Sequence, residues 1–264
     1  MQMLSTASAE TFRSVRFVLT DMDETLTYQG RLSAATYTAL EQLQTIGIKV
    51  IPVTAAPAGW CDQMARMWPV DGVIGENGGL FFQRTPDGHG ITRTFWHDPD
   101  QFSDVRSKLD AIGRRVQDMV CEATYADDQT FRLTSLAFAQ PKDKALAAHI
   151  LEALRAEGAS GTINNLWVLG WLGTYDKLAM TRRVMKEIYG VDIDTDRDSV
   201  LYVGDSTNDA PMFNFFHHTV GVSTVRQYLP DLPTPPNWIT AGPGGAGFVE
   251  AATAVIKCRQ HKIA

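Results

Sequence analysis

The most constraining feature of this chain is an apolar segment that ends in a pair of carboxylates. Residues 15–19 (VRFVL) have the composition of a buried β-strand, and Asp21 and Asp23 follow directly. Two like charges so close together repel each other, so the pair costs free energy unless a cation or a reacting group uses it. Open α/β sheets bind ligands beyond the carboxyl ends of their strands, where this pair would lie. A solvated acidic turn is the alternative, and this short motif alone does not exclude it.

Two more strand-like runs end in polar residues, and one helical segment begins with a lysine. The residues concerned are Thr54 after 48–53, Asp205, Asn208 and Asp209 after 199–203, and Lys177 at the start of the helical segment. The ends of parallel strands meet at one edge of a sheet. The sequence therefore predicts one site that combines carboxylates, a hydroxyl and an ammonium group.

These residue types fit phosphoryl transfer, which depends on positioning and on neutralising the charge of the transferred oxygens. Asp21 is placed to attack an electrophile, and Asp23 to carry protons to and from a leaving group. Mg²⁺ prefers oxygen ligands, and the histidines and cysteines lack the spacing of a zinc site. We therefore expect Mg²⁺ as the cofactor.

In the order of its four motifs the chain resembles the haloacid dehalogenase superfamily of phosphotransferases. The resemblance covers most of the chain and implies that Asp21 forms an aspartyl-phosphate and that Asp23 is the general acid/base. It also implies that Thr54, Lys177 and Asn208 bind the phosphate. The implied ligands of Mg²⁺ are Asp21, Asp23 through its backbone carbonyl, Asp205 and Asp209.

The stretch between the second and third motifs carries none of them and has the pattern of an inserted module. We expect a catalytic core of residues 1–84 and 175–264 and an α+β cap of residues 85–174. The predicted fold class is α/β, a Rossmann-like doubly wound parallel sheet with that cap inserted. Within the cap, the patterns predict helices around 105–116 and 145–156, a strand over 131–138 and a hairpin around 166–172.

An insertion at this place resembles the cap of the superfamily's type IIB subgroup, which includes sucrose and trehalose phosphatases and Cof-like sugar phosphatases. Residues 76–79 (ENGG), just before it, are similar to that subgroup's pattern at the passage from core to cap. Caps of this kind close over the metal site and select the substrate. The resemblance therefore implies a cap that determines specificity.

Two positions depart from the pattern of many relatives. Ala55 and Ala56 follow Thr54 where relatives carry Gly-Arg, so a guanidinium that commonly faces the substrate is missing. Glu24 stands where glycine is frequent and adds a third carboxylate to the first motif. Exposed acids near sites are usually solvated, so we expect Glu24 to face water.

Aromatic residues of the predicted cap give the only hint of a substrate. Trp167 and Trp171 lie four residues apart near Lys177, and the flat face of a sugar stacks well on indole. The alternative is that both pack the cap sheet, because tryptophan is usually highly buried. We favour packing and keep sugar contact as the second interpretation.

Composition excludes several partners. The net charge of −6 and the scattered basic residues give no footprint for nucleic acid. No segment has the ~20 consecutive apolar residues that span a bilayer. Three cysteines, far apart, suit a reducing compartment, and we expect a cytoplasmic protein.

Three functions remain in order of preference. The first is a Mg²⁺-dependent phosphatase acting on a phosphomonoester, with a sugar phosphate as the preferred substrate and a small phosphorylated metabolite as the expected partner. The second is a phosphosugar mutase resembling phosphomannomutase, which would use the same Asp21 and Asp23. The third is a phospho-ligand binder without catalysis, which the intact motifs disfavour.

Overall fold

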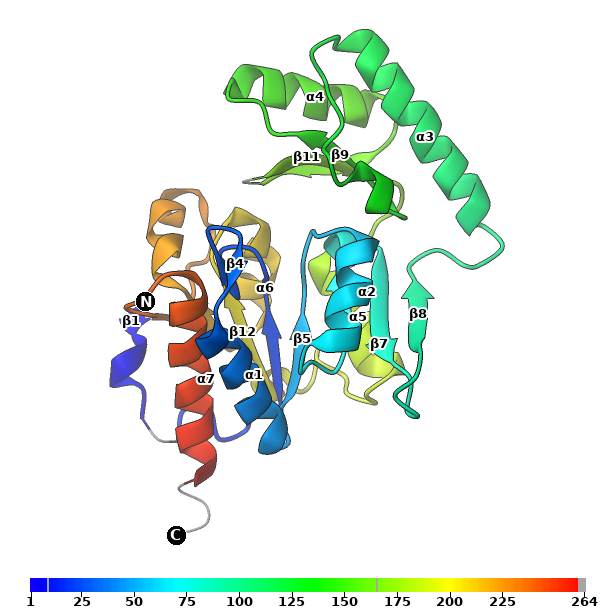
Figure 1. Cartoon of the computed structure of the whole chain (residues 1–264). Helices are drawn as coiled ribbons and strands as arrows, with labels where there is room; N and C mark the ends of the chain where they lie inside the picture. Colours follow the sequence, from blue (N-terminus) through cyan, green and yellow to red (C-terminus); the bar gives the residue numbers. More distant parts are fainter. Residues whose placement is uncertain (9, 165, 261–264) are drawn as a thin grey trace.

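A six-stranded parallel sheet forms the centre of the larger part of the molecule (Figure 1). The computed structural model describes residues 1–8, 10–164 and 166–260. In spatial order the strands are β1 (Gln2–Met3), β14 (Trp238–Ile239), β13 (His218–Gly221), β12 (Val200–Gly204), β2 (Phe17–Thr20) and β5 (Lys49–Pro52). The three strands predicted from their apolar runs are therefore direct neighbours, with β2 between the other two.

Helices cover both faces of this sheet, which explains why its strands are apolar along their whole length. Val18, Val50 and Leu201 point to one face, and Phe17, Leu19 and Ile51 point to the other. The first face packs against α1 (Ala34–Thr45), α2 (Ala58–Met67) and α7 (Gly244–Gln260). The second packs against α5 (Lys177–Glu187) and α6 (Ala210–Phe215). The predicted doubly wound α/β core is confirmed.

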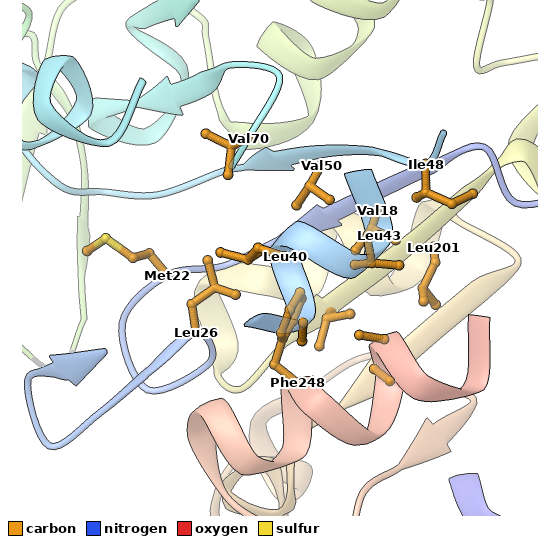
Figure 2. Packing of buried hydrophobic residues seen from close by; sticks show 14 of the residues in the cluster. Val18, Met22, Leu26, Leu40, Leu43, Ile48, Val50, Val70, Leu201 and Phe248 are labelled. Atoms are coloured by element: carbon orange, nitrogen blue, oxygen red, sulfur yellow. The ribbon is translucent and has the colours of Figure 1, made fainter. Parts of the chain in front are cut away.

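Figure 2 shows the first of these two cores from close by. Leu40 and Leu43 of α1 and Phe248 of α7 lie against the sheet residues, and each of the three is at most 1 % exposed. Leu26 joins them from the loop that follows β2. The loop that carries the first motif is thus anchored in the core by its own apolar residues.

Two small antiparallel sheets flank the ends of the central strands. The hairpin of β3 (Thr27–Tyr28) and β4 (Arg31–Leu32) follows the first motif. A three-stranded sheet of β6 (Val73–Gly75), β7 (Leu80–Arg84) and β8 (Ile91–Phe95) follows α2. A turn of 3₁₀-helix, Glu76–Gly78, connects β6 to β7.

The cap is a separate layer above the carboxyl ends of the central strands (Figure 1). Its sheet consists of β9 (Ser135–Ala139), β10 (Ser160–Ile163) and β11 (Trp167–Trp171), all antiparallel. Its helices, α3 (Phe102–Met119) and α4 (Lys144–Ala156), pack on the face of the sheet that points away from the core. Both helices predicted in this region are present.

Side chains of β11 alternate between the two faces of the cap sheet. Val168 points into the core between the sheet and its helices, together with Leu136 and Phe138 of β9. Trp167 and Trp171 point to the opposite face, toward the catalytic core. The cap sheet is therefore buried on both faces, although it is antiparallel.

The strand predicted over 131–138 is shorter than expected. β9 begins only at Ser135, because the backbone N–H groups of Leu133 and Thr134 donate to the carboxylate of Glu76 instead of to a neighbouring strand.

The division between core and cap stays a prediction. The pairing of β8 with β7 bears on it, since this pairing attaches residues 91–95 to the core side.

Short 3₁₀-helices occupy several of the connections. They are Leu4–Thr6, Gln129–Phe131, Arg197–Ser199, Thr207–Asp209, Ser223–Gln227 and Leu229–Asp231. Within the described residues, no helix combines the length and the apolar character needed to cross a membrane.

Candidate active site

The adjacency of β5, β2 and β12 brings the polar strand ends together. Asp21 follows β2, and its backbone N–H donates to the carbonyl of Val203 in β12 over 2.9 Å. Thr54 and Asp205 follow the neighbouring strands on either side. The edge of the sheet predicted from the sequence therefore exists, and Asp21 stands at its middle.

Lys177 completes the centre of the site from the start of α5. Its ammonium group lies 2.9 Å from a carboxylate oxygen of Asp21 and 2.8 Å from one of Asp209. Asp176 caps the helix by accepting a hydrogen bond from the backbone N–H of Ala179. Gly78 fixes the approach of the helix, because a Cβ there would lie 2.3 Å from the carbonyl oxygen of Asp176.

Asp209 is fully buried and holds the site together. One of its oxygens accepts from Lys177 and from the hydroxyl of Tyr202. The other accepts from the backbone N–H groups of Asp205 and Ser206. Four donors surround this carboxylate, so it fixes both the lysine and the loop that carries Asp205.

Burial and mutual repulsion shift the pKa values of the remaining acids upward. Desolvation raises the pKa of Asp21 to about 6, against the opposing field of Lys177. Desolvation, followed by the charge of Asp21, raises the pKa of Asp23 to about 7. The same two causes, in the same order, raise the pKa of Asp205 to about 9. The site thus holds more negative charge than Lys177 neutralises.

The acids fit a divalent cation. One carboxylate oxygen each of Asp21, Asp205 and Asp209 can be chosen so that all three lie within 4.8 Å of one another. All are oxygen ligands, the type that Mg²⁺ prefers, and a cation here would offset the repulsion between the acids, which contributes to their raised pKa values after desolvation. The side chain of Asp23 is not part of this group, and the contribution of its backbone carbonyl stays a prediction.

A pocket of about 300 Å³ opens above these acids between core and cap. Core residues that line it include Asp21, Asp23 and Asp205. From the cap it is lined by Asn164 and Leu166, at the tip of the hairpin formed by β10 and β11. The remaining lining residues are Glu24, Gly30, Ala55, Ser206 and Asn208. The pocket therefore joins the acids to one edge of the cap.

Sequence reasoning missed Asn164 and Leu166. The side-chain oxygen of Asn164 accepts from the backbone N–H groups of Leu166 and Trp167, which turns the chain at the hairpin tip. An asparagine between two β-rich runs is a turn signal. The hairpin was predicted around 166–172 without this signal, whereas its strands are 160–163 and 167–171, so its tip and the approach of that tip to the acids were missed.

The other predicted site residues occupy different depths. Asn208 lines the pocket, and its side-chain oxygen accepts from the hydroxyl of Ser206. Thr54 is fully buried, and its hydroxyl oxygen accepts from the backbone N–H of Ala56. Glu24 lines the pocket as well, and it accepts from the backbone N–H of Gln29 in the turn between β3 and β4. Glu24 therefore supports this hairpin and is not a purely solvated acid.

Trp167 and Trp171 do not line the pocket. Trp171 is 7 % exposed, stacks on Tyr175 and donates from its indole N–H to the carbonyl of Tyr175. Trp167 is 5 % exposed and lies between Trp60 and the guanidinium of Arg132. Both rings face the core layer and are covered by it, as in the packing interpretation that the sequence favoured. Sugar contact by these two residues stays the second interpretation.

Comparisons with solved structures extend over nearly the whole chain. A haloacid dehalogenase-like hydrolase from Bacteroides thetaiotaomicron has a TM-score of 0.61 and 15 % identity, covering 91 % of this chain and 99 % of its own. A sugar phosphatase of haloacid dehalogenase subclass IIB has a TM-score of 0.61 and 13 % identity, with coverages of 94 % and 99 %. A trehalose-6-phosphate phosphatase related protein has a TM-score of 0.62 and 14 % identity, covering 93 % of this chain and 99 % of its own.

The comparisons by sequence find nothing: no protein-family model and no curated protein matches the chain. Similarity in structure at this low identity concerns the fold. The resemblance noted in the motifs is confirmed at that level. The chain has the fold of the haloacid dehalogenase-like hydrolases, core and cap included.

Proposed function

We propose that this protein is a Mg²⁺-dependent phosphatase that hydrolyses a phosphomonoester, with a sugar phosphate as its substrate. The strongest support is the buried cluster of Asp21, Lys177 and Asp209, which reaches the pocket through Asp21 and has Asp205 beside it. A carboxylate held by an ammonium group at a sheet edge is placed to attack an electrophile that enters from above. The similar solved structures include a sugar phosphatase and a trehalose-6-phosphate phosphatase related protein.

In the first step, a carboxylate oxygen of Asp21 attacks the phosphorus. An aspartyl-phosphate forms and the bond from phosphorus to the leaving oxygen breaks. Asp23, whose pKa of about 7 leaves a protonated population at neutral pH, gives its proton to that oxygen. In the second step, Asp23 takes a proton from water, which attacks the phosphorus and releases inorganic phosphate and free Asp21. Lys177 neutralises the transferred oxygens throughout.

Asp21 and Asp205 would hold Mg²⁺, with the backbone carbonyl of Asp23 as a further ligand. Asp209 would contribute by fixing Asp205 and Lys177, since its oxygens already accept from four donors. When bound, the ion supplies positive charge that screens the phosphate from the carboxylates.

The pocket lining favours a neutral, hydroxyl-rich leaving group. Among the described residues that line it, none is an arginine or a lysine, so a second phosphate or a carboxylate would meet only acids and neutral groups. Asn164 and Glu24 offer hydrogen bonds instead. A mutase must accommodate a bisphosphate, which this lining disfavours.

The proposal is tested by measuring phosphate release from sugar monophosphates, sugar bisphosphates and nucleotides, with and without Mg²⁺. Asp21→Asn, which keeps the shape of the side chain and removes the nucleophile, is the blank. We expect turnover of a few sugar monophosphates that requires both Mg²⁺ and Asp21. Full activity of Asp21→Asn would refute the mechanism, and isomerisation that depends on a bisphosphate would favour the mutase.

A further inference from the structure

Glu76 is a buried carboxylate that connects the core to the cap. It belongs to the core, directly after β6, and is 1 % exposed. One oxygen accepts from the backbone N–H of Ala58, at 3.0 Å, and from that of Leu133, at 2.8 Å. The other accepts from the N–H and hydroxyl of Thr134, at 2.8 and 2.9 Å, and from the hydroxyl of Ser135, at 2.7 Å. Four of these five donors belong to the cap.

Arg132 makes the reverse connection from the cap to the core. Its side chain is fully buried, and its guanidinium donates to the carbonyl of Ala55 over 3.0 Å. Asp128 neutralises it through two hydrogen bonds, and the ring of Trp167 lies 4.7 Å from its carbon. The guanidinium does not line the pocket. Arg132 therefore holds the backbone of Ala55 and does not contact a substrate.

Both connections end on the same segment of the core, residues 54–58, which we call the 54–58 loop. Ala55 of this loop lines the pocket. The backbone N–H of Glu76 donates to the carbonyl of Ala56, and that of Asn77 donates to the carbonyl of Thr54. Glu76, Asn77 and Arg132 thus hold the loop along its length. Of these, Glu76 also binds the cap, and Arg132 belongs to the cap.

We propose that Glu76 is a positioning residue that, together with Arg132, couples the docking of the cap to the geometry of the 54–58 loop, and thereby sets the affinity of the site for phosphate. The proposal rests on the proposed function, because it assigns the loop to phosphate binding. The positive φ of Glu76, 48°, supports it. A non-glycine residue adopts this strained conformation only where its surroundings hold it there, and its side-chain contacts do so.

Only a carboxylate satisfies all five donors. In Glu76→Gln, the amide nitrogen would face either the N–H groups of Ala58 and Leu133 or the N–H of Thr134. A backbone N–H cannot turn to accept, so either orientation leaves a buried donor without a partner. The variant keeps the volume of the side chain and weakens the coupling specifically.

The test compares Glu76→Gln with a matched control, Glu250→Gln. Glu250 also accepts backbone N–H groups, from Ala241 and Gly242, but lies outside the pocket lining and the cap. In each protein the inhibition constant of inorganic phosphate, the KM and kcat of the best substrate, and the Mg²⁺ activation constant are measured. Amide hydrogen exchange of residues 54–58 is followed in parallel.

We expect the inhibition constant of phosphate and the KM to rise by about 10-fold in Glu76→Gln. We expect kcat and the Mg²⁺ constant to change far less, with faster exchange in the 54–58 loop and no change in Glu250→Gln. A merely structural role would lower the active fraction and leave the inhibition constant as in the wild type. A folded Glu76→Gln with unchanged phosphate inhibition would overturn the proposal.

Should Glu76→Gln fail to fold, Ser135→Ala gives the same answer at lower amplitude. This change removes one donor to Glu76 and one acceptor of Arg132, so we expect a rise of about 3-fold in the phosphate constant. No rise would contradict the coupling. If the wild type releases phosphate from no substrate, the proposed function fails by itself, and the exchange rates still decide whether Glu76 holds the 54–58 loop.

Discussion

Core and cap use their buried charges in opposite ways. In the core, Asp21 and Asp205 line the pocket and Lys177 pairs with Asp21, and the surplus negative charge is available to a ligand. In the cap, the buried pair of Arg132 and Asp128 is closed off behind the pocket wall and neutralises itself. The difference agrees with the proposal that the core performs the chemistry, whereas the cap lines one side of the pocket and holds the 54–58 loop.

The largest effect should come from the lysine that joins the core acids. Lys177→Met leaves Asp21 and Asp209 buried without their cation, so we expect loss of activity and a decrease of about 3–5 kcal/mol in the free energy of unfolding. Chemical denaturation and phosphate release measure both. Lys186→Met, on an exposed part of the same helix, is the control. A Lys177→Met variant as stable as the wild type would mean that the burial of Asp21 and Asp209 does not depend on their ion pairs with Lys177.

Asp21 and Asp23, which both line the pocket, should set the pH profile of the activity. Asp21 must be deprotonated to attack, so kcat/KM should rise with pH through about 6, and it should fall above about 7, where Asp23 loses the proton that it donates. Asp23→Asn should lower kcat about 10²- to 10⁴-fold and remove the alkaline limb. The loss in kcat/KM, which reports the first step and not the hydrolysis of the intermediate, should be smaller for an aryl phosphate, whose leaving group needs no proton. An equal loss for both substrates would contradict the assignment.

The core acids that we propose as Mg²⁺ ligands should make stability depend on pH and on Mg²⁺. The pKa of Asp205 is about 9 in the folded protein and 3.8 in the unfolded chain, so the folded state binds more protons between these values. The free energy of unfolding without Mg²⁺ should therefore decrease as pH rises across this interval.

Because Mg²⁺ binds the deprotonated carboxylates, it should raise the melting temperature more at about pH 8 than at about pH 5. Calorimetry with and without the ion measures this, and Asp205→Asn should abolish most of the shift. A shift of equal size at both pH values, or one that Asp205→Asn leaves intact, would place the ion elsewhere.

The smallest effect should come from the cap side of the pocket. Asn164→Ala removes a polar lining group, and we expect KM for the best sugar phosphate to rise about 3- to 10-fold with kcat nearly unchanged.

Trp167→Phe should lower stability and leave the ranking of substrates as it is, because the ring does not line the pocket. A changed ranking of substrates with unchanged stability would favour the tryptophans as substrate contacts.

Much of the core could be predicted because its signals are local. Each apolar run is a strand with both faces buried, and each polar residue after it stands at the strand end that the pattern indicates. Asp21 and Asp205 were found in this way, and Lys177 was found because it begins a segment with helical periodicity. The strand over 131–138 was predicted too long, because the acceptor that ends it, Glu76, lies more than fifty residues away in the sequence.

By itself, the sequence determined the three central strands, the helix that begins at Lys177 and the two cap helices, together with the polar groups at the strand ends, since all depend on patterns within a few residues. Only the tertiary structure decided what these groups touch. It placed Lys177 between Asp21 and Asp209, turned the tryptophans into the interface and brought Asn164 over the acids. Burial and contacts across the chain set these outcomes, and no local pattern encodes the distance between residues far apart in the sequence.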